Sequence, residues 1–210
     1  MARRNFIPLV LLLLCPAVQA GSPAILVMGD SLSAGYGLKV EQTWPRLLQQ
    51  KLERTGLPYR VVNASISGDT TSGGLARLPR ALKIHEPAVV IIELGGNDGL
   101  RAVPIPEIRD NLVRMIELSR ETGAEVLVTS ILIPPNYGPD YSEKFAAVFA
   151  EAADIAGATV APFILDGIAL EPGMMQADGI HPTAAAQPRI VANLWPSLCP
   201  LLAAEQISRC

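Results

Sequence analysis

Three residues of this 210-residue chain, Ser31, Asp178 and His181, are of the types that together carry out acyl transfer. Ser31 follows an apolar run (24–28) and a Gly29-Asp30 turn, so we expect it where a strand ends. Reacting groups collect at that edge in open α/β folds. A serine needs a neighbouring base before it acts as a nucleophile. Taken alone, the turn is better explained by a residue that caps the next helix.

Only one of the two histidines suits the role of that base. His85 lies near the end of a predicted helix, so we interpret it as a solvated helix terminus. His181 follows Asp178 by three residues, a separation at which a carboxylate can orient the imidazole and stabilise the imidazolium. The alternatives are a structural Asp–His hydrogen bond or a pair of metal ligands. A metal site would need a third or fourth ligand, and no histidine or cysteine cluster supplies one.

Acyl transfer also needs hydrogen-bond donors aimed at the oxygen that becomes negative. The candidates are the backbone N–H groups of Ser31 and Gly68 and the side-chain amide of Asn97. Each follows a predicted strand. Taken singly, Gly68 and Asn97 are ordinary turn residues. Together with Ser31 and His181 they favour an oxyanion hole.

Predicted strands and helices alternate along the chain. Short apolar or β-branched runs, two of them typical of strands covered on both faces, lie at 24–28, 59–62, 88–92, 125–131 and 159–163. Helical periodicity lies between them. One such helix, marked by Leu75, Leu78 and Leu82, contains Pro79, which we expect to interrupt it or start its second half. The alternation indicates a three-layer parallel α/β domain.

The first twenty residues have the features of a signal peptide. Arg3 and Arg4 precede an apolar centre at 9–14, and Val18-Gln19-Ala20 resembles a cleavage site. The centre is too short to span a membrane, which takes about 20 residues. We therefore expect cleavage after Ala20 and export, to the periplasm of a Gram-negative bacterium or into the medium.

Residues 21–210 would then form a single domain with 15 basic and 20 acidic residues, a net charge near −5. No basic run suits nucleic acid. Removing the leader also removes Cys15 and leaves Cys199 and Cys210. In an oxidising compartment these two could form a disulfide, although two free thiols are an equal alternative.

Four segments occur in the order and setting of the SGNH, or GDSL, hydrolase family: Gly29-Asp30-Ser31-Leu32, Gly68 in its polar loop, Gly95-Gly96-Asn97-Asp98, and Asp178-Gly179-Ile180-His181-Pro182. The resemblance runs from about residue 24 to 195. Longer stretches around the four segments are similar to one subgroup, the exported bacterial acyl-CoA thioesterase I, lysophospholipase and arylesterase proteins.

The resemblance implies a flavodoxin-like α/β/α fold with five parallel strands in the order 2-1-3-4-5. It implies a serine hydrolase of fatty-acyl esters and thioesters that uses no cofactor or metal. Ser31 would be the nucleophile, His181 the base and Asp178 its partner. Ser31, Gly68 and Asn97 would form the oxyanion hole.

Residues 134–138 resemble the substrate loop of the subgroup, which would make Pro135, Asn136 and Tyr137 substrate-binding. An ordinary proline-rich connection is the alternative. We expect a monomer with a small acyl substrate, no nucleic acid and no stable membrane anchor.

Other functions remain open from sequence. A carbohydrate O-acetylesterase would use the same four segments, and acyl-chain preference would distinguish it. A flavodoxin-like nucleotide-binding module is disfavoured because no phosphate-loop or dinucleotide glycine pattern occurs. The Gly-x-Ser-x-Gly elbow of ordinary α/β-hydrolases is also absent. A catalytically inactive relative is disfavoured by the intact motif residues.

Overall fold

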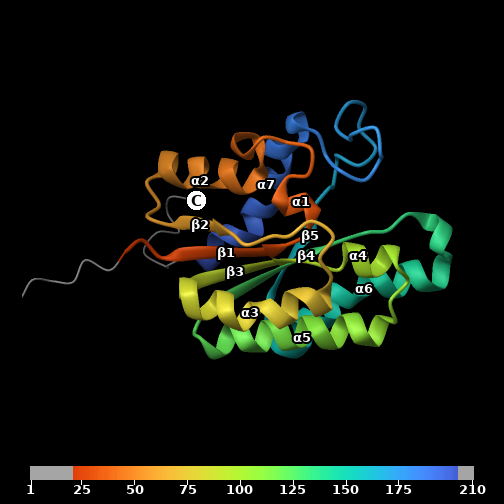
Figure 1. Ribbon diagram of the computed structural model, residues 1–210, viewed down its shortest axis with the longest axis horizontal. Coiled ribbons are helices and arrows are strands. Elements are labelled where there is room, and N and C mark those ends of the chain that lie inside the picture. The colour runs from red at the N-terminus through yellow and green to blue at the C-terminus, as the bar shows by residue number, and fades with distance from the viewer. Residues whose placement is uncertain (1–20, 203–210) are drawn as a thin grey trace, which may run out of the picture.

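The computed structural model describes residues 21–202, where five parallel strands form one sheet between two helical layers (Figure 1). The strand order β2-β1-β3-β4-β5 confirms the prediction. The strands are β1 (Ala24–Gly29), β2 (Arg60–Asn63), β3 (Pro87–Glu93), β4 (Glu125–Ser130) and β5 (Thr159–Phe163). The predicted leader lies outside the described residues.

The helices divide between the two faces of the sheet (Figure 1). One layer holds α1 (Ser31–Ala34), α2 (Trp44–Thr55) and α7 (Gln187–Leu198), and the other holds α3 (Thr71–His85), α5 (Ile105–Glu121) and α6 (Pro139–Ala156). The short α4 (Gly96–Leu100) follows β3 directly, and single 3₁₀ turns occur at η1 (Val40–Gln42), η2 (Pro135–Tyr137), η3 (Ala184–Ala186) and η4 (Cys199–Leu201). This is the three-layer α/β/α architecture expected from the alternation.

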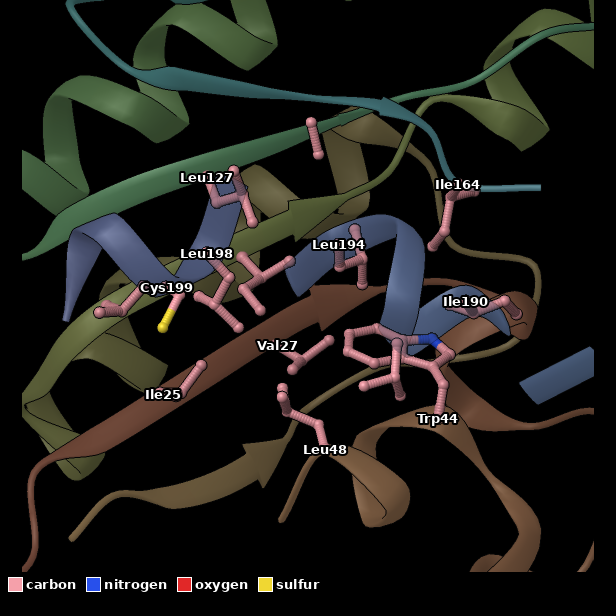
Figure 2. Close-up of a cluster of buried hydrophobic side chains, with 14 of the residues drawn as sticks. Ile25, Val27, Trp44, Leu48, Leu127, Ile164, Ile190, Leu194, Leu198 and Cys199 are labelled. Carbon is pink, nitrogen blue, oxygen red and sulfur yellow. The ribbon is translucent and has the colours of Figure 1, made fainter. Parts of the chain in front are cut away.

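Alternate side chains of the central strands enter two separate cores, because successive residues of a strand point to opposite faces. Ile25 and Val27 of β1 pack with Trp44 and α7 in one core, shown in Figure 2. Leu26 and Met28 pack in the other core, against α3, α5 and α6. Both faces of β1 are therefore buried, which explains its uninterrupted apolar sequence.

The expected interruption at Pro79 is wrong, since α3 runs unbroken from Thr71 to His85 with Pro79 inside it. Proline removes one backbone N–H, the partner of the Leu75 carbonyl. Pro79 is exposed, so water can satisfy that carbonyl on the outer side of the helix. His85 is the last residue of α3, as its interpretation as a helix terminus required.

The register of the sheet brings the functional loops to one edge. Gly29, the last residue of β1, lies opposite Glu93, the last residue of β3, and Val27 lies opposite Asn63 of β2. The segments that follow, with Ser31, Gly68 and Asn97, therefore begin at the same carboxyl edge.

Cys199 is buried at the end of α7 and takes part in a disulfide. Its proposed partner, Cys210, lies outside the described residues. Among residues 21–202, every helix is too short or too polar to span a bilayer.

Candidate active site

Ser31 is the first residue of α1, immediately after the carboxyl end of β1. Asp30 caps this helix, because its Oδ1 accepts the N–H of Leu32 at 3.0 Å. The helix ends after one turn at Gly35, whose φ of 79° suits glycine. The turn therefore presents Ser31 at a helix N-terminus, where backbone N–H groups have no partner within the helix.

The glycine before this turn allows a close approach of buried polar groups. A Cβ at Gly29 would lie 2.6 Å from Ser33 Oγ and 2.8 Å from Glu93 Oε2. Those two atoms are themselves joined, since the Ser33 hydroxyl donates to Glu93 Oε2 at 2.6 Å. The requirement for glycine comes from this pair beneath the turn.

The structure brings Ser31, His181 and Asp178 together in a continuous hydrogen-bonded chain. His181 Nε2 lies 2.8 Å from Ser31 Oγ, and His181 Nδ1 lies 2.7 Å from Asp178 Oδ2. Asp178 Oδ1 also accepts the backbone N–H groups of Ile180 and His181, at 2.9 and 3.0 Å. With Nδ1 protonated toward the carboxylate, Nε2 is free to accept the proton of Ser31.

These hydrogen bonds lower the pKa of Asp178 to about 2, mainly through the backbone N–H of His181 and then through its ring. Hydrogen bonds to a carboxylate favour its charged form. Asp178 therefore stays ionised near neutral pH, and its charge can stabilise the imidazolium that forms when His181 takes a proton.

The two backbone donors of the predicted oxyanion hole are open. Gly68 has a φ of 81°, and no atom lies within 4 Å of the position that a Cβ would take. Across the described part of the chain, neither the Ser31 nor the Gly68 N–H donates to a backbone carbonyl.

The third candidate donor, Asn97, already uses its amide group. Asn97 Nδ2 donates to the Asp69 carbonyl at 2.9 Å and to Asp30 Oδ2 at 3.0 Å. These two bonds hold the Asn97 amide next to the Gly68 loop, with its nitrogen facing Asp69 and Asp30. An oxyanion would have to share one N–H with an acceptor already present.

The carboxyl of Asp30 is buried next to this amide. Burial raises the pKa of Asp30 to about 6, although the hydrogen bond from the Leu32 N–H acts to lower it.

The predicted substrate loop lies beside α4. The Tyr137 hydroxyl donates to the Leu100 carbonyl at 2.8 Å, and the Tyr141 hydroxyl donates to Val103 at the same distance. Asn136 is exposed on η2, which Pro135 begins. Substrate binding by Pro135, Asn136 and Tyr137 stays a prediction.

Several residues that contact the site were not predicted. The Tyr36 ring lies 4.4 Å from the His181 ring, centroid to centroid. Arg77 donates to Asp69 Oδ2 at 2.7 Å and to the Gly29 carbonyl at 3.3 Å, so it ties the Gly68 loop to β1. Local sequence patterns carry no signal for contacts of this kind, because their partners are backbone atoms or distant residues.

No group of three or more His, Cys, Asp or Glu side chains suited to a metal ion occurs within residues 21–202. The groups that the structure does bring together there are the Ser31 hydroxyl, the His181 imidazole and the Asp178 carboxylate.

Known proteins resemble this chain over nearly its whole length. A family model described as GDSL-like Lipase/Acylhydrolase matches residues 27–188. The esterase TesA of Pseudomonas aeruginosa is 53% identical over 184 residues, which is 88% of this chain and 92% of the relative. Thioesterase 1/protease 1/lysophospholipase L1 of Escherichia coli K12 is 41% identical over 199 residues, or 95% and 94% of the two chains.

Structural similarity agrees with the sequence matches. A crystal structure of TesA superposes with a TM-score of 0.83 at 53% identity, and covers 85% of this chain and 99% of that one. From the matched family, the strand order and the Ser31–His181–Asp178 geometry together, the chain belongs to the GDSL-like lipase/acylhydrolase family and is a hydrolase of ester bonds.

Proposed function

We propose that this chain is a serine esterase and thioesterase that hydrolyses fatty-acyl esters, aryl esters, acyl-CoA and lysophospholipids through an acyl-enzyme on Ser31. The observation that carries the proposal is the 2.8 Å contact between Ser31 Oγ and His181 Nε2. The names of the similar proteins, an esterase and a thioesterase/lysophospholipase, support the substrate class.

The reaction needs two displacements at one carbonyl carbon. In the first, Ser31 Oγ attacks while His181 Nε2 takes its proton, and His181 then protonates the departing alcohol or thiol. In the second, a water gives a proton to His181 and attacks the acyl-enzyme carbonyl. The bond between the acyl carbon and Ser31 Oγ then breaks, His181 returns the proton to Ser31 Oγ, and the carboxylic acid leaves. Asp178 keeps the imidazole in the required tautomer throughout.

The N–H groups of Ser31 and Gly68 and the amide of Asn97 would stabilise the oxyanion of both tetrahedral intermediates. Two of these donors are peptide groups held by the backbone. This arrangement costs little reorganisation during the reaction, because the donors are already fixed before the charge develops.

Exposed apolar side chains near the site support an acyl substrate. Ile66 precedes the Gly68 loop, Leu132 follows β4, and Ile180 adjoins His181, with 54%, 51% and 45% of their surfaces exposed. We assign Pro135, Asn136 and Tyr137 to the same acyl-binding region. Burying such surface against an alkyl chain would favour binding by about 25 cal/mol per Å².

We also infer that residues 1–20 are an export signal and that residues 21–210 act as a monomeric domain in the periplasm or outside the cell, without a cofactor. The disulfide at Cys199 supports an oxidising compartment.

The test is hydrolysis of a chain-length series of p-nitrophenyl esters, an acyl-CoA, a lysophospholipid and an acetylated sugar by wild type and Ser31→Ala. We expect esters longer than acetyl to be cleaved well, and Ser31→Ala to lose all of these activities while keeping its thermal midpoint. The exposed Ser72→Ala on α3 is the control. Wild-type rates in Ser31→Ala would overturn the assignment of Ser31 as the nucleophile. A strict preference for the acetylated sugar would favour the alternative function of a carbohydrate O-acetylesterase.

A further inference from the structure

His181, the proposed catalytic base, lies on a connection with little regular structure. Residues 164–183 link β5 to α7, and their only strand-like pairing is a single antiparallel bridge between Met175 and Pro182. Asp178 has 38% of its side chain exposed. Misplacing a reacting group by about 1 Å can cost roughly 10²-fold in rate. Something must therefore hold this loop against the segment that carries Ser31.

Several backbone hydrogen bonds shape the loop from within. The Gln176 N–H donates to the His181 carbonyl at 2.7 Å, and the Gly179 N–H donates to the Gln176 carbonyl at 3.0 Å. The Thr183 N–H donates to the Met174 carbonyl at 2.7 Å. All of these partners lie within the loop, so these bonds set its shape without joining it to the segment that carries Ser31.

The side chain of Gln176 connects this loop to the segment that carries Ser31. Gln176 Nε2 donates to the Tyr36 carbonyl at 2.9 Å and to the Pro182 carbonyl at 3.1 Å. Pro182 follows His181 directly. Tyr36 is tied to the nucleophile, because its N–H donates to the Ser31 carbonyl at 3.1 Å. One amide group thus bridges the serine segment and the histidine segment.

The surroundings of Gln176 are built around this amide. A Cβ at position 37 would lie 2.6 Å from Gln176 Oε1, so Gly37 leaves room for the side chain. The backbone carbonyl of Tyr36 accepts from Gln176, and the Tyr36 ring lies tilted against the His181 ring, with 4.4 Å between the centroids. Tyr36 therefore contacts the histidine loop twice, through its backbone carbonyl at Gln176 and through its ring at His181.

A second glutamine joins the end of the histidine loop to α2, farther from the reacting atoms. Gln187, fully buried at the start of α7, accepts the Trp44 N–H at 2.9 Å and donates to the Thr183 carbonyl at 3.3 Å. It anchors the end of the loop in the core. Gln176 acts nearer the loop tip, where His181 lies.

We propose that Gln176 is a positioning residue that holds His181 at proton-transfer distance from Ser31. The proposal rests on the proposed function, in which these two residues exchange the proton. Gln176 itself contacts backbone carbonyls and takes no part in the chemistry. Its loss should leave substrate binding intact and slow the chemical step.

The first variant is Gln176→Met, which keeps the length of the side chain and removes both donors. We expect kcat for a medium-chain p-nitrophenyl ester to fall about 10- to 100-fold, with KM changed less than about 3-fold, because a displaced base slows proton transfer. Gln176→Asn, which keeps an amide but shortens it by one methylene, should show the same split. It provides the test if the methionine variant does not fold.

Gln49→Met is the matched control. Gln49 also bridges two segments, since its Nε2 donates to the Tyr59 carbonyl at 3.3 Å and its Oε1 accepts the Val61 N–H at 2.7 Å. This bridge joins α2 to β2, away from the site. We expect Gln49→Met to lower the thermal midpoint and to leave kcat unchanged.

A second readout does not depend on activity. The chain has two histidines, so NMR of the ring nitrogens reports His181 with His85 as an internal reference. We expect the His181 ring signals to shift or broaden in Gln176→Met while those of His85 stay in place. Wild-type kcat together with unchanged His181 signals would overturn the proposal. Retained activity in Ser31→Ala would instead overturn the proposed function.

Discussion

Asn97 has two amide hydrogens and, at rest, two acceptors for them. One acceptor is the neutral carbonyl of Asp69 and the other is the buried carboxyl of Asp30. An oxyanion that approaches the amide competes with these oxygens for a hydrogen. In the proposed oxyanion hole the Asn97 amide would be oriented before the reaction begins, and its bond to Asp30 or Asp69 would lengthen as the intermediate forms.

Asn97→Ala should lower kcat by roughly 10²–10³-fold, the usual cost of losing one oxyanion-hole donor. KM should change little, because the donor acts mainly after the carbonyl oxygen becomes negative. Steady-state kinetics on a medium-chain p-nitrophenyl ester measure both quantities. A rise in KM at constant kcat would show that Asn97 binds substrate instead.

The residues of the proton-transfer chain could be predicted, whereas the residues that hold them could not. Asp178 and His181 are three apart, a spacing at which two side chains can meet locally. Gln176 acts through backbone carbonyls, one of them 140 residues away at Tyr36. No side-chain type is required at such an acceptor, so no pattern marks it.

The turn between β1 and α1 depends on the space left by Gly29. Ser33 and Glu93 occupy the volume that a side chain at position 29 would need. A new Cβ would have to displace this buried pair or the turn that carries Ser31. Overpacking of this kind commonly costs about 1–3 kcal/mol.

Gly29→Ala should therefore lower the free energy of unfolding by about 1–3 kcal/mol and also reduce kcat, since the turn presents the nucleophile. Urea denaturation and ester hydrolysis measure the two effects. Gly21→Ala is the control, because no atom lies within 4 Å of a Cβ there. Wild-type stability and rate in Gly29→Ala would contradict the account of the turn.

The strands were predicted to within a few residues, because a strand covered on both faces is apolar throughout. The segment around Asn97 was predicted as a loop and is the helix α4. Glycine disfavours helix, so the glycines of this segment give it no helical sequence pattern. A long-range contact stabilises the helix, because the Asp98 carboxylate accepts the N–H and the hydroxyl of Thr71, at 2.9 and 2.6 Å.

Two acids are buried at the carboxyl edge of the sheet, Glu93 and Asp30. Glu93 is fully buried, and its Oε1 has no hydrogen-bond partner among the described residues. Burial and then the charge of Asp30 raise the pKa of Glu93 well above its usual value. Burial also raises the pKa of Asp30, from 3.8 to about 6.

Raised acid pKa values make the folded protein less stable as pH increases. Between the unfolded and the folded pKa, the native state keeps a proton that the unfolded chain has released, so the free energy of unfolding falls with pH. For Asp30 this window runs from about pH 4 to 6, and for Glu93 it starts near pH 4.5 and extends upward. Asp178 acts in the opposite sense and only below about pH 4.

Glu93→Gln should reduce the loss of stability between pH 5 and pH 8, because glutamine keeps the shape and cannot ionise. The difference in slope should reach at most about 1.4 kcal/mol per pH unit, the value for one proton. Urea denaturation of both proteins at the two pH values measures it. Parallel pH dependence in the two proteins would show that Glu93 does not carry the effect.

The overall topology could be predicted because alternating strands and helices leave few arrangements. The buried acids could not be predicted as such. Asp30 follows β1 and Glu93 ends β3, each beside polar residues in the sequence, and Glu93 is buried where Ser33 of α1 donates to it.

In the proposed reaction every acyl group is transferred to Ser31 before it is released. The most direct measurement is acid quenching of a single turnover with a medium-chain p-nitrophenyl ester, followed by mass spectrometry of the peptides. We predict an adduct with the mass of the acyl group on the peptide containing Ser31, absent in Ser31→Ala. An adduct on another residue, or hydrolysis at the wild-type rate in Ser31→Ala, would contradict the account.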